Sequence, residues 1–185
     1  MARAFKTLGR TDAPVTIMEF TDLQCPYCAE FELQILPVLR QRYVDTGLVK
    51  FASYDLPLNF HPYALPAAIA AHCAGEQGRY WPYREALYRA QPSLPTAPYA
   101  QLAQRFGLDL ARFESCRNDP ERQALVLADA QKAASKGIQS TPSFVIGRIV
   151  DGRFEGELIT GAQPLEVFDA RLQAALKAAR EPASH

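Results

Sequence analysis

Residues 15–28 read VTIMEFTDLQCPYC and carry the strongest structural signal in the chain. The first six of them, Val15 to Phe20, place apolar side chains on both faces of an extended backbone. Such a run is typical of an interior strand in a sheet that is covered on both sides. A short polar turn then leads to two cysteines three positions apart, Cys25 and Cys28. The order predicts a buried strand, a turn, and a helix that begins at a pair of thiols.

The residues after the cysteines complete a strand–helix–strand unit. Apolar side chains recur at a spacing of four, as expected of one helix face, at Phe31, Ile35, Leu39 and Tyr43. Pro37 lies inside this pattern and predicts a kink. Gly47 is a plausible helix terminator, and residues 48–54 look like a second strand. We expect the crossover between the two strands to be right-handed.

A long helical region follows the second strand. Between residue 62 and about residue 137 the chain is rich in alanine, is interrupted by glycines and prolines, and has no strand pattern. The expected helices cover residues 64–74, 81–90, 99–106, 110–116 and 120–136. We therefore predict an inserted helical subdomain at 62–137, and a core formed by residues 1–61 and 138–185.

The end of the chain predicts two further strands and a helix. A β-type run begins at Ser143, is clear to Ile146 and can be extended to Val150. Asp151-Gly152 is a strong hairpin signal, and residues 153–159 form the expected returning strand. From Pro164 onward an apolar stripe predicts the last helix, at Leu165, Phe168, Leu172 and Leu176. The element order predicts an α/β thioredoxin-like fold, with the helical insert between the second and third core strands.

Length and charge exclude several classes of protein. The chain has 185 residues, enough for one compact domain with an elaboration, and its 20 basic residues balance 20 acidic ones. This balance argues against a nucleic-acid binder and against docking to an anionic membrane. No apolar run approaches the roughly 18 residues that span a bilayer, and residues 1–12 lack the apolar run of a signal peptide. The protein is therefore expected either to be cytoplasmic or to have had a leader or anchor ahead of these residues.

The cysteine pair predicts redox chemistry. Cys25 would lie at a helix start, where free N–H groups and the helix dipole favour a thiolate. Cys28, one turn further, would be shielded and would resolve a mixed disulfide. The alternatives are two purely structural cysteines, or zinc bound by all four cysteines. Structural zinc sites usually have two close pairs of ligands, so we predict no metal site.

Residues 12–28 resemble the corresponding segment of bacterial DsbA-like proteins, in the branch with Cys-Pro-x-Cys. Residues 144–164 resemble the closing hairpin and helix of that family, and the insert has its length. The resemblance implies a dithiol oxidase that passes its disulfide to folding extracytoplasmic proteins without an organic cofactor. It also implies a membrane quinone-linked reoxidase of the DsbB or VKOR type, and a monomer. A reductase or isomerase of the same chemistry is the alternative, and a binding or chaperone module is a more distant one.

The resemblance also assigns roles around the thiols. Thr141 and Pro142 match the family's threonine and cis-proline, which lie beside the reactive cysteine and pair with a substrate segment. Pro26 and Tyr27 complete the predicted substrate contacts. The most oxidising members of the family have histidine where this chain has Tyr27, so we expect a less extreme thiolate.

Three further expectations concern buried groups. Glu19 matches a buried acid of thioredoxin-like proteins, and burial would raise its pKa so that it takes the proton of Cys28; the alternative is a strand-end residue without a role. By resemblance, Cys73 and Cys116 form a second, structural disulfide, although two separate buried thiols would also suit helix cores. Because stable disulfides persist in oxidising compartments, this bridge would indicate an extracytoplasmic protein of the periplasm or cell envelope, with a cytoplasmic one as the alternative. His61 and His72 lack metal-ligand spacing and are interpreted as surface or capping residues.

Overall fold

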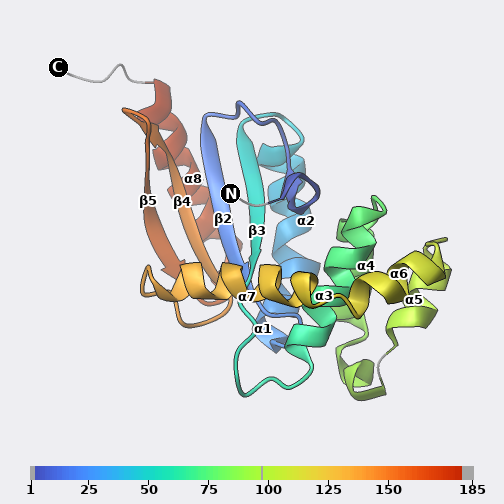
Figure 1. Cartoon of the computed structure of the whole chain (residues 1–185). Helices are drawn as coiled ribbons and strands as arrows, with labels where there is room; N and C mark the ends of the chain where they lie inside the picture. The colour runs from blue at the N-terminus through green and yellow to red at the C-terminus, as the bar shows by residue number, and fades with distance from the viewer. Residues whose placement is uncertain (1–2, 97, 181–185) are drawn as a thin grey trace.

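The computed structural model describes residues 3–96 and 98–180. The strands are β1 (Thr7–Leu8), β2 (Val15–Thr21), β3 (Val49–Asp55), β4 (Ser143–Val150) and β5 (Arg153–Thr160). The α-helices are α1 (Pro26–Glu30), α2 (Leu36–Leu39), α3 (Ala64–Glu76), α4 (Tyr80–Arg89), α5 (Tyr99–Arg105), α6 (Leu110–Arg117), α7 (Pro120–Ala134) and α8 (Leu165–Arg180). The strands form one sheet in the order β1-β3-β2-β4-β5, drawn in Figure 1.

Strand β2 lies at the centre of the sheet, as its two apolar faces predicted. It pairs in parallel with β3 and antiparallel with β4, so that Ile17 lies opposite Phe51 on one side and Ile146 on the other. The hairpin of β4 and β5 turns at Asp151 and Gly152, which both have positive φ. The predicted thioredoxin-like α/β fold is confirmed.

The helical segment after the cysteines changes its type along its length. Between α1 and α2 the stretch Phe31–Ile35 is π-helical, and Arg40–Val44 after α2 is π-helical as well. Pro37, where the sequence predicted a kink, lies in the first turn of α2, directly after the first π stretch. Proline has no N–H to donate, so Pro37 cannot continue the helical hydrogen-bond pattern. The pattern changes from π-helical to α-helical at this position.

Helices cover both faces of the sheet (Figure 1). On one face Phe31 from the segment after Cys28 packs against Phe144 of β4 and Phe168 of α8, and all three side chains are buried. On the other face α7 crosses the sheet, and its Ala133 lies in the same apolar cluster as Phe20 of β2. The sheet is therefore buried on both sides, which explains the near-continuous apolar character of β2.

The helices α3 to α7 occupy the interval between β3 and β4, and a 3-10 helix, Gln91–Thr96, joins α4 to α5. Buried alanines of α3 and aromatic side chains such as Tyr83 and Phe113 give this region a core of its own. That core also contains Cys25 and Cys28. The insert thus packs directly behind the thiols.

The first residues form a short strap that the sequence did not predict. A 3-10 turn, Ala4–Lys6, leads into β1, which pairs with β3 at the edge of the sheet. Lys6 is buried, and its ammonium contacts the carboxylates of Asp55 and Asp129. Phe5 meets the ring of His72 edge-on at 5.1 Å between centroids. In the described ranges, no helix has the length and apolar character needed to cross a membrane.

Candidate active site

The two thiols lie where the central strand gives way to a helix. Cys25 is the N-cap residue of α1, with extended backbone angles, and Pro26 occupies the first helical turn, where its missing N–H costs nothing. The amides of Cys28 and Ala29 donate to the carbonyl of Cys25 and close the first turn. Cys25 is 4% exposed and Cys28 is fully buried, and both are free thiols in the structure.

Hydrogen bonds from neighbouring loops hold the turn before Cys25. The buried carboxylate of Asp22 accepts from the amides of Gln24 and Leu58 and lies 2.8 Å from Nδ1 of His61. The side-chain oxygen of Gln24 accepts from the amide of Tyr63 at 2.7 Å. The loop after β3 is therefore fixed to the active-site turn, and His61 is one of its anchors.

The insert holds the same turn from the other side. Gln91 donates from its side-chain amide to the carbonyls of Leu23 and Cys25, both at 3.0 Å. Gln91 lies 66 residues from Cys25 in sequence, in a 3-10 segment without a recognisable motif. No local signal could have identified it as part of the site.

The surroundings of Cys25 favour its thiolate. A hydrogen bond from the Cys28 thiol is the largest cause that lowers the pKa of Cys25 to about 6. Burial opposes this shift, while the amides of Cys28 and Tyr27 add to it. The amide contribution is the one that the helix start predicted. Cys25 is therefore a good leaving group and a reactive nucleophile near neutral pH.

The environment of Cys28 has the opposite effect. Burial raises the pKa of Cys28 well above its usual range, and the neighbouring Cys25 raises it further. A hydrogen bond from the Thr21 side chain acts in the other direction. The pair thus combines one thiolate near the surface with one protonated thiol behind it.

The structure brings Thr141 and Pro142 to the thiols. Their peptide bond is cis, and the Thr141 carbonyl lies 3.5 Å from the Cys25 sulfur. Pro26 is exposed, and Tyr27, on the same helical turn, is 63% exposed. The four residues assigned to substrate contact thus belong to the segments that flank Cys25.

Glu19 is fully buried, but it is not a lone acid. Its two carboxylate oxygens each lie 2.8 Å from a nitrogen of Arg84, on α4. The same guanidinium bonds Glu32 at 2.8 Å and the hydroxyl of Ser53 at 2.6 Å. Burial raises the pKa of Glu32 to about 7 although Arg84 opposes the shift.

Arg84 and Glu32 were not identified from the sequence. Glu32 follows Cys28 by four positions, so one helical turn separates the two, and this spacing was the available signal. Arg84 is 65 residues away from Glu19 and had none. Arg84 is a cation directly beside Glu19, the acid that the sequence analysis identified.

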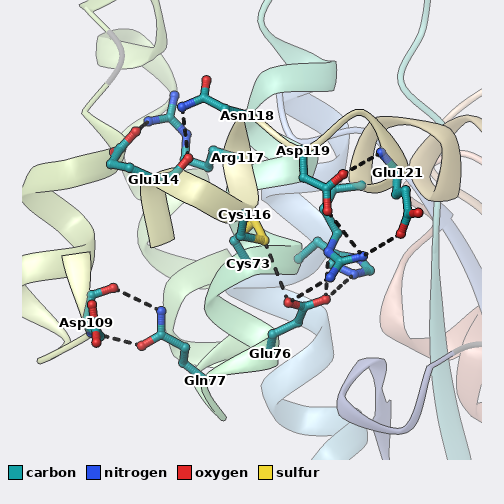
Figure 2. The surroundings of a disulfide bond; sticks show 12 residues. Cys73, Glu76, Gln77, Asp109, Glu114, Cys116, Arg117, Asn118, Asp119 and Glu121 are labelled. Carbon is teal, nitrogen blue, oxygen red and sulfur yellow. Dashed lines mark hydrogen bonds and ion pairs between the residues drawn. A yellow bond between two sulfur atoms is a disulfide. The ribbon is translucent and has the colours of Figure 1, made fainter. Parts of the chain in front are cut away.

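The remaining two cysteines are joined to each other. Cys73 of α3 and Cys116 of α6 form a disulfide with their Cα atoms 5.8 Å apart. Figure 2 shows Glu76 beside this bond. The carboxylate of Glu76 lies 2.9 Å from Nε of Arg122. The bridge ties two helices of the insert together among charged side chains.

The surface interpretation of His72 was wrong. His72 is 2% exposed, and burial, followed by the nearby charges of Lys6, Arg3 and Arg122, lowers its pKa to about 3. It lies one turn before Glu76 on α3, beneath the N-terminal strap. The apolar spacing of α3 did not indicate that His72 is buried. Most residues of this helix are buried on all sides, so the sequence shows no exposed face from which a buried face could be distinguished.

The fold and the dithiol together define the class of DsbA-like thiol–disulfide oxidoreductases. A family model described as Thioredoxin matches residues 4–161, and the chain belongs to that family. The resemblance seen in residues 12–28 and 144–164 is thereby confirmed.

Proteins similar to this chain include both disulfide oxidoreductases and ion antiporters. The structure of alpha-DsbA1 from Wolbachia pipientis aligns with a TM-score of 0.83 and 26% identity, over 94% of this chain and 92% of that one. The probable disulfide bond formation protein D of Bacillus anthracis is 26% identical over 162 residues, 81% of this chain and 73% of that protein. The Na(+)/H(+) antiporter NhaA 3 of Salinispora tropica is 35% identical over 176 residues. These cover 94% of this chain but 26% of the antiporter, so the chain spans about a quarter of the length of the antiporter relatives it matches.

Proposed function

We propose that the chain is a dithiol oxidase that transfers the Cys25–Cys28 disulfide to reduced proteins. A substrate thiolate attacks the sulfur of Cys25, and Cys28 leaves as a thiolate. The second thiolate of the substrate then attacks the mixed disulfide, and Cys25 leaves. The substrate gains a disulfide, and the two electrons remain on the Cys25–Cys28 dithiol.

The observation that carries this proposal is the set of hydrogen bonds that lowers the pKa of Cys25 to about 6. A group that stabilises the thiolate stabilises the reduced enzyme, and this makes its disulfide a better oxidant. Reference values are about 7 for thioredoxin and about 3.5 for DsbA. The value for Cys25 lies between them, in agreement with Tyr27 in place of histidine, so we propose an intermediate potential.

Other residues take supporting roles in the proposal. Pro142 and Thr141 would pair with the backbone of the substrate, with Pro26 and Tyr27 beside it. Glu19, held in place by Arg84, would accept the proton of Cys28 when that thiol attacks a mixed disulfide at Cys25, and would return it when Cys28 leaves as a thiolate. Cys73 and Cys116 would stabilise the insert and take no part in the reaction.

The proposed partners are reduced proteins outside the cytoplasm and a membrane quinone-linked reoxidase of the DsbB or VKOR type. Support comes from the Bacillus relative, whose name refers to disulfide bond formation. The disulfide between Cys73 and Cys116 also supports an oxidising compartment, because such bonds persist there. We propose that the chain acts as a monomer.

The reduction potential of the Cys25–Cys28 pair, measured in glutathione buffers, tests the direction of transfer. We expect about −180 mV or higher, the range of proteins that donate disulfides. A potential of about −230 mV or lower would assign the chain to reductases instead, because donation would then be unfavourable in most compartments. A Cys73→Ala, Cys116→Ala variant is the control that excludes a contribution from the second disulfide.

A further inference from the structure

The leaving sulfur of the proposed reaction is fully buried. When a substrate attacks Cys25, the electron pair of the broken bond remains on Cys28, which is 0% exposed. A charge in such a place is costly unless hydrogen bonds meet it. The groups that contact Cys28 therefore affect the rate of the first step, and this inference rests on the chemistry proposed above.

Two buried hydroxyl groups, on Thr21 and Tyr88, are hydrogen-bonded to each other at the end of β2 that precedes the thiols. The side chain of Thr21, the last residue of β2, acts on Cys28 as a hydrogen-bond partner that lowers the pKa of its thiol against the effect of burial. The Thr21 Oγ1 lies 2.6 Å from the hydroxyl of Tyr88, on α4. Thr21 is 3% exposed and Tyr88 is 2% exposed, so the interior of the protein shields this chain of contacts.

The direction of the hydrogen bonds follows from the chemistry of the sulfur. A thiolate only accepts, so Thr21 must use its single O–H to donate to Cys28. The oxygen of Thr21 can then accept from Tyr88. Burial raises the pKa of Tyr88 well above its usual range, and the phenol accordingly keeps its proton.

We propose that Thr21 and Tyr88 form a donor relay that stabilises the departing Cys28 thiolate. Thr21 is the catalytic residue, since it touches the reacting sulfur, and Tyr88 is a positioning residue that orients Thr21. In the step, a bond forms between the substrate sulfur and Cys25, and the Cys25–Cys28 bond breaks. The substrate sulfur is oxidised, Cys28 is reduced, and the relay protons stay on their oxygens.

The test is the second-order rate constant for reduction of the Cys25–Cys28 disulfide by dithiothreitol. Samples are quenched with acid, alkylated, and analysed by mass spectrometry on the peptide that contains both cysteines. We expect Thr21→Val to be about tenfold slower, since a hydrogen bond to a charged group is worth about that factor or more. Thr21→Ser keeps the hydroxyl and should restore the rate to within about twofold.

A double-mutant cycle separates the relay from a structural contact. Tyr88→Phe should be about threefold slower, and the Thr21→Val, Tyr88→Phe double variant no slower than Thr21→Val, because the two groups act in series. Thr16→Val, a buried threonine at the other end of β2, is the matched control and should react like wild type. A wild-type rate for Thr21→Val, or effects that multiply in the double variant, would overturn the relay.

The test remains informative if one variant does not fold, and also if the proposed oxidase function is wrong. If Thr21→Val does not fold, Tyr88→Phe decides alone, and a wild-type rate for it overturns the proposal. The comparison uses a small-molecule reductant and is independent of the cellular direction of transfer. A low reduction potential would thus refute the oxidase and leave the relay to its own test.

Discussion

Cys25 and Cys28 are three positions apart on the first turn of α1, yet their sulfur atoms lie in two different environments. The sulfur of Cys25 faces the cis-proline segment and the first amides of α1, whereas the sulfur of Cys28 faces the end of β2 and the core of the insert. Hydrogen-bond donors act on the first sulfur, and desolvation acts on the second. The two cysteines are chemically identical, so the difference in their reactivity follows from the groups that each sulfur faces.

Alkylation of the reduced protein checks this asymmetry. We expect the rate with iodoacetamide to rise with a midpoint near pH 6, because the thiolate of Cys25 is the reacting species and its pKa is lowered to about 6. At pH 7 the thiolate should exceed the thiol about tenfold. A Cys25→Ser variant should lose the fast reaction. A midpoint near the ordinary thiol value of 9.0 would contradict the geometry described.

Among the elements, those with a complete local signal were predicted from the sequence. Strand β2 has apolar residues on both faces, and the hairpin at Asp151 has its own turn residues. Strand β1 has two residues and forms because it pairs with β3, so nothing within it could be recognised. Arg84 lies in ordinary helical sequence and Gln91 in a short 3-10 segment, and both join the site because the insert folds back over the thiols. The dithiol was predictable and its supports were not, since long-range packing brings the supports together.

Helices α3 and α6 owe part of their association to the Cys73–Cys116 bond. The bond closes a loop of 43 residues, and the chain-entropy model gives about 4 kcal/mol for that length. We expect a Cys73→Ala, Cys116→Ala variant to lose up to about that much unfolding free energy, measured with urea while Cys25–Cys28 remains intact. A Cys25→Ser, Cys28→Ser variant is the contrast, because it should lose activity and retain most of its stability. Equal stability with and without the bridge would mean that the helices are held by packing alone.

Across the whole molecule, buried and half-buried charges connect the insert to the sheet. Arg84 of α4 contacts Glu19 of β2, and Asp129 of α7 shares Lys6 with Asp55 of β3. Removing one partner of a buried pair leaves a charge without compensation, which is strongly destabilising. The insert and the core are thus expected to unfold together rather than separately.

His72 makes the stability of the whole molecule depend on pH. Its pKa is about 3 in the folded protein and about 6.5 in an unfolded chain, so below pH 6.5 the unfolded state binds a proton that the folded state does not. The stability that His72 contributes is complete above pH 6.5 and is lost as the pH falls toward 3, by about 1.4 kcal/mol per unit. We expect His72→Leu to remove this component from the slope of unfolding free energy between pH 6 and about 4.

The comparison uses slopes because other groups titrate in the same range. Burial raises the pKa of Glu32 from 4.5 to about 7, so its effect has the opposite sign: stability falls as the pH rises through that interval. Wild type and His72→Leu share this contribution, and their difference isolates His72. Identical slopes would show that the pKa of His72 is not lowered in the folded protein.

The N-terminal strap limits where the chain can be truncated or fused to another segment at its N-terminus. Lys6 is the cation between two carboxylates, and Phe5 lies so close to α3 that even a methyl group on Gly75 would meet its ring at 2.4 Å. A trimmed version that begins at Thr7 would leave the buried Asp55 without its cation and open a gap over α3. Affinity tags, cleavage sites and fusion joints should therefore be placed ahead of this segment, because it is an integral part of the packed core.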